Sequence, residues 1–382
     1  MFENLTLPQL QQLWWIIISL IGALFVFLTF VQGGQSLLNS VARNDMEKSL
    51  IVNSLGRKWE FTFTTFVLFS GALFAAFPLF YATSFGGAYW VWITILFTFV
   101  LQAVSFEFRK KPGNLLGART YEMFLFVNGT IGILLIGITL ATFFSGSSFQ
   151  LDDYNHVLWQ HPLRGLEAAM SFFNVALGLF LVFLARMLGA LYLINNIDFR
   201  LHIVKDLEKR LRTAVSANLA ASIPFLLYFM VSLTAREGFA VNPETGKVLL
   251  ESGKYLQNLL AMPAVAAMLA VGLLLVLLGA VIGRLTSTAG IWYSGLGTVL
   301  VAFGLFLTAG FNNTPFYPSS FDLNSSLTIH NGSSSRYTLT AMGYIALGVP
   351  FVLAYIAYFW HIMDREKIST GEVSDFTAKE IY

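Results

Sequence analysis

The chain has 382 residues, of which 56% are hydrophobic and only 12% are charged, and its formal net charge is +2 at pH 7. A soluble domain carries about a quarter charged residues, so this composition excludes both a water-exposed surface and a disordered chain. The small net charge gives no reason to expect nucleic-acid binding, and the absence of cysteine excludes disulfides, thiolate metal sites and cysteine nucleophiles. We therefore predict an integral membrane protein.

Nine apolar stretches along the chain are long enough to cross a membrane. A hydrocarbon core about 30 Å thick requires about 20 residues of α-helix, because each residue adds about 1.5 Å. The stretches cover residues 13–31, 61–81, 89–106, 123–144, 168–185, 215–235, 256–282, 291–311 and 338–360. The sequence thus predicts an all-α fold with nine transmembrane helices in a single polytopic domain, 1–382.

The distribution of basic residues predicts the orientation. The flank at 1–12 contains no Lys or Arg, and the apolar run after it is too long for the core of a cleaved signal peptide. An outer N-terminus places 18 of the 23 Lys and Arg residues in inner segments, a bias that usually determines topology. The five in outer segments are Arg164, Arg236, Lys247, Lys254 and Arg336. We expect the N-terminus outside and the C-terminus in the cytoplasm.

Loop lengths suggest how the spans are grouped. Inner loops run long then short through the first four spans, and again through the next four. This pattern favours two four-helix bundles, within 13–144 and 168–311, followed by one additional helix at 338–360. The inner segment 196–212 has apolar residues on one helical face and basic residues on the other. It is typical of an interfacial helix on anionic lipid.

Four prolines fall inside the predicted spans. Pro78, Pro224, Pro263 and Pro350 each remove a helical hydrogen-bond donor, and a membrane helix tolerates this where neighbouring groups satisfy the freed carbonyl. We expect kinks or breaks at these positions.

The spans as drawn contain none of the charged side chains. Ion-coupled transporters usually keep an ionisable group near the membrane midplane, so the sequence argues against a complete ion path inside this chain. The histidines lie outside the spans or at their ends, at positions 156, 161, 202, 330 and 361, and no two share one face of a span. We therefore predict that the chain alone binds neither haem nor metal.

Polar residues gather where the spans end on the inner side. Gln32 and Gln35 close the first span, Glu60 opens the second and Glu107 closes the third. At one depth on one side, these four residues could pass protons or water toward a neighbouring protein. The alternative is structural, because the glutamates could extend to the interface or pair with Arg57, Lys58 and Arg109.

The outer segment 311–337 is rich in hydroxyl groups, almost uncharged and stiffened by two prolines. It predicts an ordered cap over the mouth of the bundle. We expect packing to be its main role and ligand contact a second one.

Separated motifs in this chain, taken in order, resemble subunit II of the cytochrome bd quinol oxidase family. The first and last thirds of the chain match well, and the middle matches only in outline. The motifs are Trp14-Trp15, Trp59-Glu60, Gly71-Ala72-Leu73-Phe74-Ala75-Ala76 with Pro78 and Tyr81, Phe106-Glu107-Phe108-Arg109, Pro318-Ser319-Ser320, Ser326-Leu327-Thr328, Ser334-Ser335 and Pro350.

The resemblance implies a haem-free subunit of the bacterial inner membrane. Its partner would be subunit I, which carries haem b and haem d, oxidises quinol and reduces oxygen to water. The resemblance also implies a role in assembly, a proton or oxygen route, and in some members a structural quinone or a small accessory subunit. Trp59, Arg109, Pro318, Ser319, Ser320 and Thr328 are then interface or structural candidates, and no catalytic residue is expected in this chain.

The sequence departs from the family at the proposed proton route. The family often has two aspartates around a glycine pair where this chain has Gln32 and Gln35, and Glu60 and Glu107 replace aspartates. Phe61 stands where the family usually has a glycine after the Trp-Asp pair. Because glutamine does not change protonation state, a relay through Gln32 and Gln35 would need water.

The alternative function is a self-contained secondary transporter.

Overall fold

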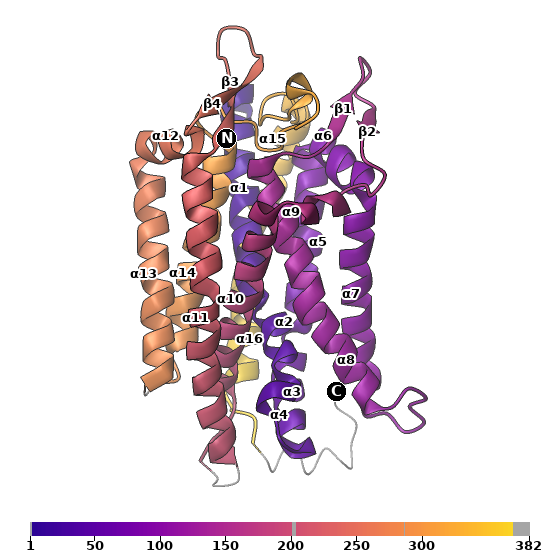
Figure 1. Cartoon of the computed structure of the whole chain (residues 1–382), viewed down its shortest axis with the longest axis vertical. Helices are drawn as coiled ribbons and strands as arrows, with labels where there is room; N and C mark the ends of the chain where they lie inside the picture. The colour runs from indigo at the N-terminus through magenta and orange to yellow at the C-terminus, as the bar shows by residue number, and fades with distance from the viewer. Residues whose placement is uncertain (1, 201–203, 286, 370–382) are drawn as a thin grey trace.

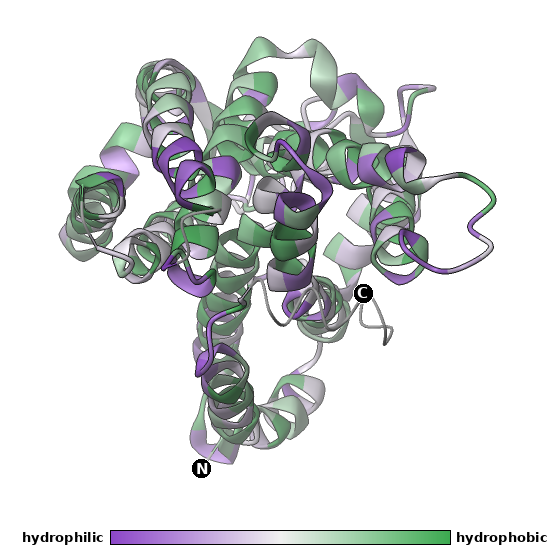
Figure 2. Ribbon diagram, turned by 90° about the horizontal axis from the view of Figure 1, so that it is seen from below, coloured by the Kyte–Doolittle hydropathy of each residue, from purple (hydrophilic) through white to green (hydrophobic). Residues whose placement is uncertain are grey.

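The computed structural model describes residues 2–200, 204–285 and 287–369. Within these residues nine helical segments are long and apolar enough to cross a membrane, which confirms the predicted all-α, nine-span fold. The helices run side by side along the long axis of the molecule (Figure 1). Seen along that axis, their ribbons are coloured mainly as hydrophobic residues (Figure 2).

The first four spans are each built from one or more helical elements. After the short η1 (Phe2–Asn4), these elements are α1 (Leu7–Leu28), α2 (Phe30–Ser36), α3 (Leu38–Val41), α4 (Asp45–Gly56), α5 (Trp59–Ala76), α6 (Pro78–Tyr81), the π-helical η2 (Ala82–Gly87), α7 (Tyr89–Phe108), α8 (Ala118–Val127), the π-helical η3 (Asn128–Gly132) and α9 (Ile133–Ser145).

The remaining spans follow after a first strand pair. Their elements are β1 (Phe149–Leu151), β2 (Val157–Trp159), η4 (Leu166–Met170), α10 (Phe172–Asn196), α11 (Lys205–Ala235), β3 (Glu237–Val241), β4 (Val248–Ser252), α12 (Lys254–Ala261), α13 (Pro263–Leu285), α14 (Gly290–Gly310), η6 (Leu323–Ser325), α15 (Arg336–Ala346) and α16 (Val349–Asp364).

Two short antiparallel hairpins add to the helical fold. Strand β1 pairs with β2 and β3 pairs with β4, and both hairpins lie at the same end of the molecule as the start of α1 (Figure 1). We call this end the outer end, following the predicted orientation, and the opposite end, where α3 and α4 lie, the inner end. The sequence did not predict the hairpins, because each strand has only three to five residues.

Three of the four prolines coincide with breaks between helical elements. Pro78 begins α6, Pro263 begins α13, and Pro350 lies in the first turn of α16. Proline has no N–H and its ring clashes with the preceding turn, so a helix starts at it more easily than it continues through it. Pro224 is the exception, since α11 continues through it.

Glycines allow α2 and α10 to lie in backbone contact. A Cβ atom on Gly33 would lie 2.0 Å from the carbonyl oxygen of Ala185, and one on Gly189 would lie 2.2 Å from the backbone nitrogen of Gly34. Any larger residue would force the two backbones apart. Helix α2 belongs to the first span and α10 to the fifth, and α10 also contacts α9 of the fourth span and α11 of the sixth. These contacts join the first four spans to the next four. The grouping into two four-helix bundles and one added helix stays a prediction.

The predicted interfacial helix at 196–212 is wrong for the residues that the structure describes. Helix α10 ends at Asn196, and from Lys205 onward the segment forms the first turns of the membrane-spanning α11. Its apolar residues Val204, Leu207 and Leu211 are fully buried against the protein. The amphipathic pattern therefore reflects packing on neighbouring helices instead of lipid.

Candidate functional site

Four buried amide side chains meet between the first, third and fourth spans. Gln32 and Gln35 lie on α2, Gln102 lies on α7 and Asn128 begins η3. None of the four is more than 1% exposed. We call these four residues the amide array.

The amide array is linked by direct hydrogen bonds. Gln35 Nε2 donates to Asn128 Oδ1 at 2.8 Å and to the carbonyl of Leu125 at 2.9 Å. Gln102 Nε2 donates to Gln35 Oε1 at 2.7 Å, and Gln32 Nε2 donates to Gln102 Oε1 at 3.2 Å. Each amide both donates and accepts, which suits a buried site where an unpaired polar group is costly. The exception is Gln32 Oε1, which has no partner among the described residues.

An ion triad of Lys48, Arg109 and Glu122 lies on the inner side of the amide array. Glu122 accepts from Lys48 Nζ at 2.6 Å and from Arg109 Nη2 at 2.8 Å, and it is almost fully buried. Glu122 belongs to α8, which begins at Ala118, five residues before the predicted span. It stands two turns before Asn128, so the triad and the array form one polar series along α8 and η3.

The structure separates the four residues predicted to form one inner cluster. Gln32 and Gln35 are buried, whereas the side chains of Glu60 and Glu107 lie at the surface. Glu107 is 51% exposed and pairs with Lys111, one turn further along. The partners named in the structural alternative also differ, because Arg109 pairs with Glu122 and Lys58 pairs with Asp364.

Trp59 and Lys58 lie at the start of α5 near the end of the last span. The Trp59 ring stacks on Phe106 with centroids 6.1 Å apart. Lys58 is fully buried, and its Nζ lies 2.9 Å from Asp364 Oδ1 and 5.0 Å from the centre of the Trp360 ring. These contacts attach α16 to the rest of the molecule at the inner end.

The outer segment 311–335 is ordered by its own hydrogen bonds and by bonds to the β1 region. Pro318 is buried, and its carbonyl accepts from the N–H of Ser147 at 2.9 Å. The Ser320 N–H donates to the Ser147 carbonyl, and the buried Ser319 hydroxyl donates to the backbone of β1. The N–H of Thr328 donates at 2.7 Å to an asparagine of the same segment. We call this segment the cap.

Arg186 is a charged residue that lies inside a membrane-spanning helix, just beyond the limit of the predicted span. Helix α10 continues past the predicted limit at residue 185 and includes Arg186, about 21 Å from its outer end. Arg186 Nε donates to Ser36 Oγ at 2.9 Å, and Nη2 donates to Thr130 Oγ1 at 3.0 Å. Its guanidinium also lies 5.8 Å from the centre of the Phe126 ring. Hydroxyls and an aromatic face thus stabilise this charge inside the span.

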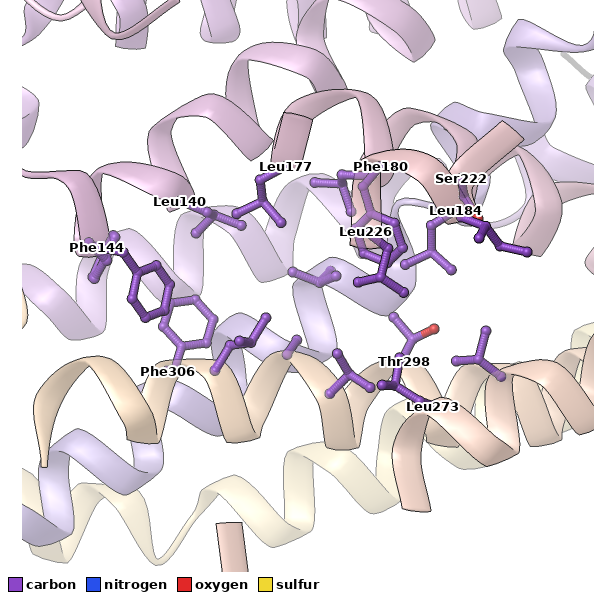
Figure 3. Close-up of a pocket in the computed structure, with 18 of the residues that line it drawn as sticks. Leu140, Phe144, Leu177, Phe180, Leu184, Ser222, Leu226, Leu273, Thr298 and Phe306 are labelled. Carbon is purple, nitrogen blue, oxygen red and sulfur yellow. The ribbon is translucent and has the colours of Figure 1, made fainter. Parts of the chain in front are cut away.

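A cavity of about 310 Å³ lies among α1, α9, α10, α11, α13 and α14. Its wall is almost entirely apolar, and the side chains of Leu140, Leu177, Phe180 and Phe306 point toward a common space (Figure 3). Ser222 and Thr298 are its hydroxyl residues, and each donates to a carbonyl of its own helix. We call this cavity the apolar chamber. Such a chamber stays dry and accepts apolar guests.

A second, smaller apolar cavity continues from the apolar chamber toward α5 and α7. It measures about 20 Å³ and shares Leu140, Phe143 and Phe306 with the apolar chamber. Its other wall is aromatic and includes Phe66 and Trp92. We call it the aromatic cavity. The two cavities thus form an apolar series across the bundle.

Metal and haem ligands are not brought together in the part of the chain that the structure describes. No group of three or more His, Asp or Glu residues there could hold a metal ion. His156, His161 and His330 lie at the outer end, and the exposed His361 lies near the end of α16. His202 lies outside the described residues. That the chain alone binds no haem stays a prediction.

Sequence reasoning missed Gln102, Asn128, Glu122 and Arg186. Gln102 and Asn128 are amides inside the predicted spans, and a search for uncharged polar residues within the spans would have found them. Glu122 and Arg186 fell just beyond the limits of the predicted spans, which followed the apolar stretches.

Comparison with known proteins gives consistent matches along the chain. The family model described as cytochrome bd terminal oxidase subunit II matches residues 10–363. The cytochrome bd-I ubiquinol oxidase subunit 2 of Escherichia coli is 28% identical over 373 residues, covering 93% of this chain and 95% of that protein. The cytochrome bd ubiquinol oxidase subunit 2 of Bacillus subtilis is 24% identical over 372 residues, covering 96% and 99%.

A solved structure shares the fold. A chain in the bd oxidase of Geobacillus thermodenitrificans superposes with a TM-score of 0.66 at 15% sequence identity. The match covers 94% of this chain and 100% of that chain, so the whole nine-span arrangement is similar.

Proposed function

The chain belongs to the cytochrome bd terminal oxidase subunit II family, and on that basis we propose that it is the haem-free second subunit of a bd-type quinol:oxygen oxidoreductase. The observation that carries this proposal is a family match over residues 10–363, which include all nine spans except the first three residues and the last residue. The transporter alternative has no comparable support. The protein is a multi-pass membrane subunit, and we place it in the bacterial inner membrane.

The redox chemistry belongs to the partner in this proposal. Subunit I would carry haem b and haem d, which supply electron transfer from quinol and the reduction of oxygen to water. The described histidines of this chain lie at the ends of the molecule or on its surface and do not face the bundle interior, so they do not fit a haem site. This chain would hold its partner in an assembled state, with or without a small accessory subunit.

Co-purification tests the assembly role. An affinity tag on this chain should bring down a haem-bearing membrane protein of similar size, and membranes lacking this chain should hold much less assembled haem d. If haem d reaches the partner at full level without this chain, the assembly role is contradicted.

The apolar chamber and the aromatic cavity support an oxygen route through this subunit. Dioxygen is small and apolar, so it dissolves in lipid and can enter a dry cavity between helices. From the apolar chamber it would pass Leu140, Phe143 and Phe306 into the aromatic cavity and toward the exposed side of α5 and α7. The side chains of this chain would exclude water and leave the gas a path.

Filling the apolar chamber tests the oxygen route. Ala302 lines it, so Ala302→Phe in the assembled complex should raise the KM for oxygen about three- to tenfold while kcat and haem content stay unchanged. Ala264→Phe on the exposed face of α13 is the matched control. An unchanged KM in Ala302→Phe, with the complex intact, would leave the route without support.

The apolar chamber also supports a structural quinone as a second occupant. An isoprenoid tail is apolar and fits a wall whose hydroxyls are already bonded within their own helices. Organic extraction of the purified complex should recover quinone beyond the substrate site, and Ala302→Phe should remove that excess. Equal quinone in both proteins would place any such quinone elsewhere.

A proton route from the inner end is the second candidate function, and the polar series favours it. Glu60 and Glu107 would collect protons at the inner surface, and the series would continue from Glu122 to Gln35 and Gln32. Its amides could carry protons only with water, because they do not titrate.

Removing the surface carboxylates tests the proton route. The double variant Glu60→Gln with Glu107→Gln should slow oxygen consumption several-fold at unchanged haem content. Glu244→Gln in the β3–β4 hairpin is the control, because it removes an exposed carboxylate at the opposite end. Unchanged turnover in the double variant would leave these residues a structural role only.

A further inference from the structure

A polar cavity of about 240 Å³ lies at the outer end beneath the cap. It is bounded by the outer ends of α7, α9, α10 and α11 and by the loops around β1 and β2. Neither the oxygen route nor the proton route uses it. We call it the outer cavity.

Arg236 brings a positive charge to the outer cavity. It caps the C-terminus of α11, and its guanidinium lies 4.5 Å from the centre of the Phe173 ring. Its Nε is buried without a hydrogen-bond partner, and the side chain forms no ion pair with the described residues. Burial lowers the pKa of Arg236, yet a guanidinium stays protonated in a protein. The partial negative charge at the end of α11, about half an elementary charge, offsets this charge only in part.

Other polar groups face the same cavity unused. The hydroxyls of Ser148, Ser171 and Ser320 form no hydrogen bond within the part of the chain that the structure describes. Asn174 is only 3% exposed, and its Oδ1 has no partner while its Nδ2 donates to the Ala168 carbonyl. Burial raises the pKa of Tyr317 to about 12, so this lining residue is a neutral hydroxyl. The outer cavity therefore offers a cation, several hydroxyl donors and one acceptor.

The one carboxylate in the wall is already engaged. Glu167 Oε1 accepts from Trp159 Nε1 at 2.7 Å, and Oε2 accepts from the Gly165 N–H at 2.7 Å. His161 Nδ1 lies 3.6 Å from the same Oε2. The N–H groups of Trp159 and Gly165 stabilise the negative charge of Glu167, so it needs no cation from the cavity.

We propose that the outer cavity binds a phosphate group through the Arg236 guanidinium and the hydroxyls of Ser171 and Ser320. A tetrahedral oxyanion accepts hydrogen bonds from several directions at once, and these donors come from three separate parts of the chain. Guanidinium is the side-chain group best matched to phosphate. A hydroxyl of the phosphate or of an attached headgroup donates to Asn174 Oδ1. The phosphate comes either from an outer-leaflet phospholipid or from solution.

The test uses the purified complex of both subunits, stripped of bound lipid. One arm titrates inorganic phosphate at constant ionic strength and follows the thermal midpoint, because a ligand of the native state raises it saturably. The other arm adds vesicles of phosphatidylglycerol or phosphatidylcholine and counts retained phospholipid by native mass spectrometry. Arg236→Gln is the test variant. Lys247→Gln is the control, since it removes an exposed charge at the same end outside the outer cavity.

The expected result is phosphate binding that Arg236→Gln weakens at least tenfold and Lys247→Gln leaves unchanged. A response to inorganic phosphate assigns the site to the free anion, and retention of phospholipid alone assigns it to a headgroup. If wild type responds in neither arm, or if both variants behave as wild type, the proposal is overturned. Should Arg236→Gln fail to assemble, the double variant Ser171→Ala with Ser320→Ala keeps the charge and should still weaken binding several-fold. Wild-type binding by that variant would contradict the site.

Discussion

Gln35 makes more side-chain hydrogen bonds than the other members of the amide array. It donates to the Leu125 carbonyl and to Asn128, and it accepts from Gln102. In a membrane span no water replaces these partners, so each lost bond leaves a polar group exposed to an apolar surrounding. The array therefore holds α2, α7 and η3 in register whether or not protons pass through it.

Replacing Gln35 with leucine tests this structural role. Gln35→Leu keeps a similar side-chain volume but leaves Gln102 Nε2 and Asn128 Oδ1 without their partner. An orphaned buried polar group costs about 1–3 kcal/mol, and measured hydrogen bonds between membrane helices average about 0.6 kcal/mol, so we expect a loss of about 1–3 kcal/mol. Thermal unfolding of the complex in detergent measures it.

The control for Gln35→Leu is Thr94→Val. Thr94 is half-buried, and its hydroxyl bonds only to the carbonyl of Trp90 in its own helix. Its loss should change stability by less than about 0.5 kcal/mol. If the two variants are equally stable, the amide array does not hold the helices together.

Single residues were predicted from the sequence only where position along one helix was enough. Gln32 and Gln35 were identified because they end an apolar run, and both belong to the polar series. Their partners Gln102 and Asn128 lie 67 and 93 residues away from Gln35 in the sequence. The spacing of residues within one helix does not predict the helix packing that brings them together. Glu60 and Glu107 share the predicted depth but point outward, because depth does not fix the face of a helix.

At the scale of helices, backbone contact through glycine sets how closely α2 approaches α10. The position of a Cβ on Gly33, 2.0 Å from the Ala185 carbonyl, leaves no room for even one methyl group. Membrane helices depend on such small residues because lipid gives no hydrophobic drive for association. The pair of Gly33 and Gly34 thus serves packing.

Gly33→Ala should therefore disrupt the fold strongly. Overpacking costs about 1–3 kcal/mol when side chains can yield, and here the obstacle is backbone, so we expect the loss to reach or exceed 3 kcal/mol. The yield of assembled complex and its thermal midpoint measure this. Gly71→Ala is the control, because its Cβ meets nothing within 4 Å and alanine favours helix. Equal stability of both variants would contradict the close contact.

Helix number followed from hydropathy, but helix limits did not. The nine spans were predicted correctly because a run of about 20 apolar residues has the length and hydropathy of a membrane-spanning helix. The predicted spans ended with the apolar stretches at 185 and began again at 215, yet α10 passes through Arg186 and α11 begins with a charged turn at Lys205. Hydroxyls and an aromatic ring on neighbouring helices stabilise Arg186, and the charges at the start of α11 contact carboxylates and backbone carbonyls, such as Glu47 with Arg210. Those neighbours are known only once the helices are packed.

The orientation of the whole molecule in the membrane can be measured with single introduced cysteines, because the chain has no cysteine of its own. The positive-inside bias places the β3–β4 hairpin outside and the start of α11 inside. In intact cells, Lys247→Cys should react with a membrane-impermeant maleimide, and Lys209→Cys should react only after the membrane is opened. Both side chains are exposed, so reactivity reports the side of the membrane. The reverse pattern would overturn the predicted topology.

The central proposal is that a partner subunit, and not this chain, carries the redox centres, and the family match supports it. The visible absorption spectrum of the tagged chain, purified alone and then with its partner subunit, measures this assignment most directly. We predict no haem bands from the chain alone and both haem b and haem d bands from the complex. Haem bound stoichiometrically by the isolated chain would contradict the account.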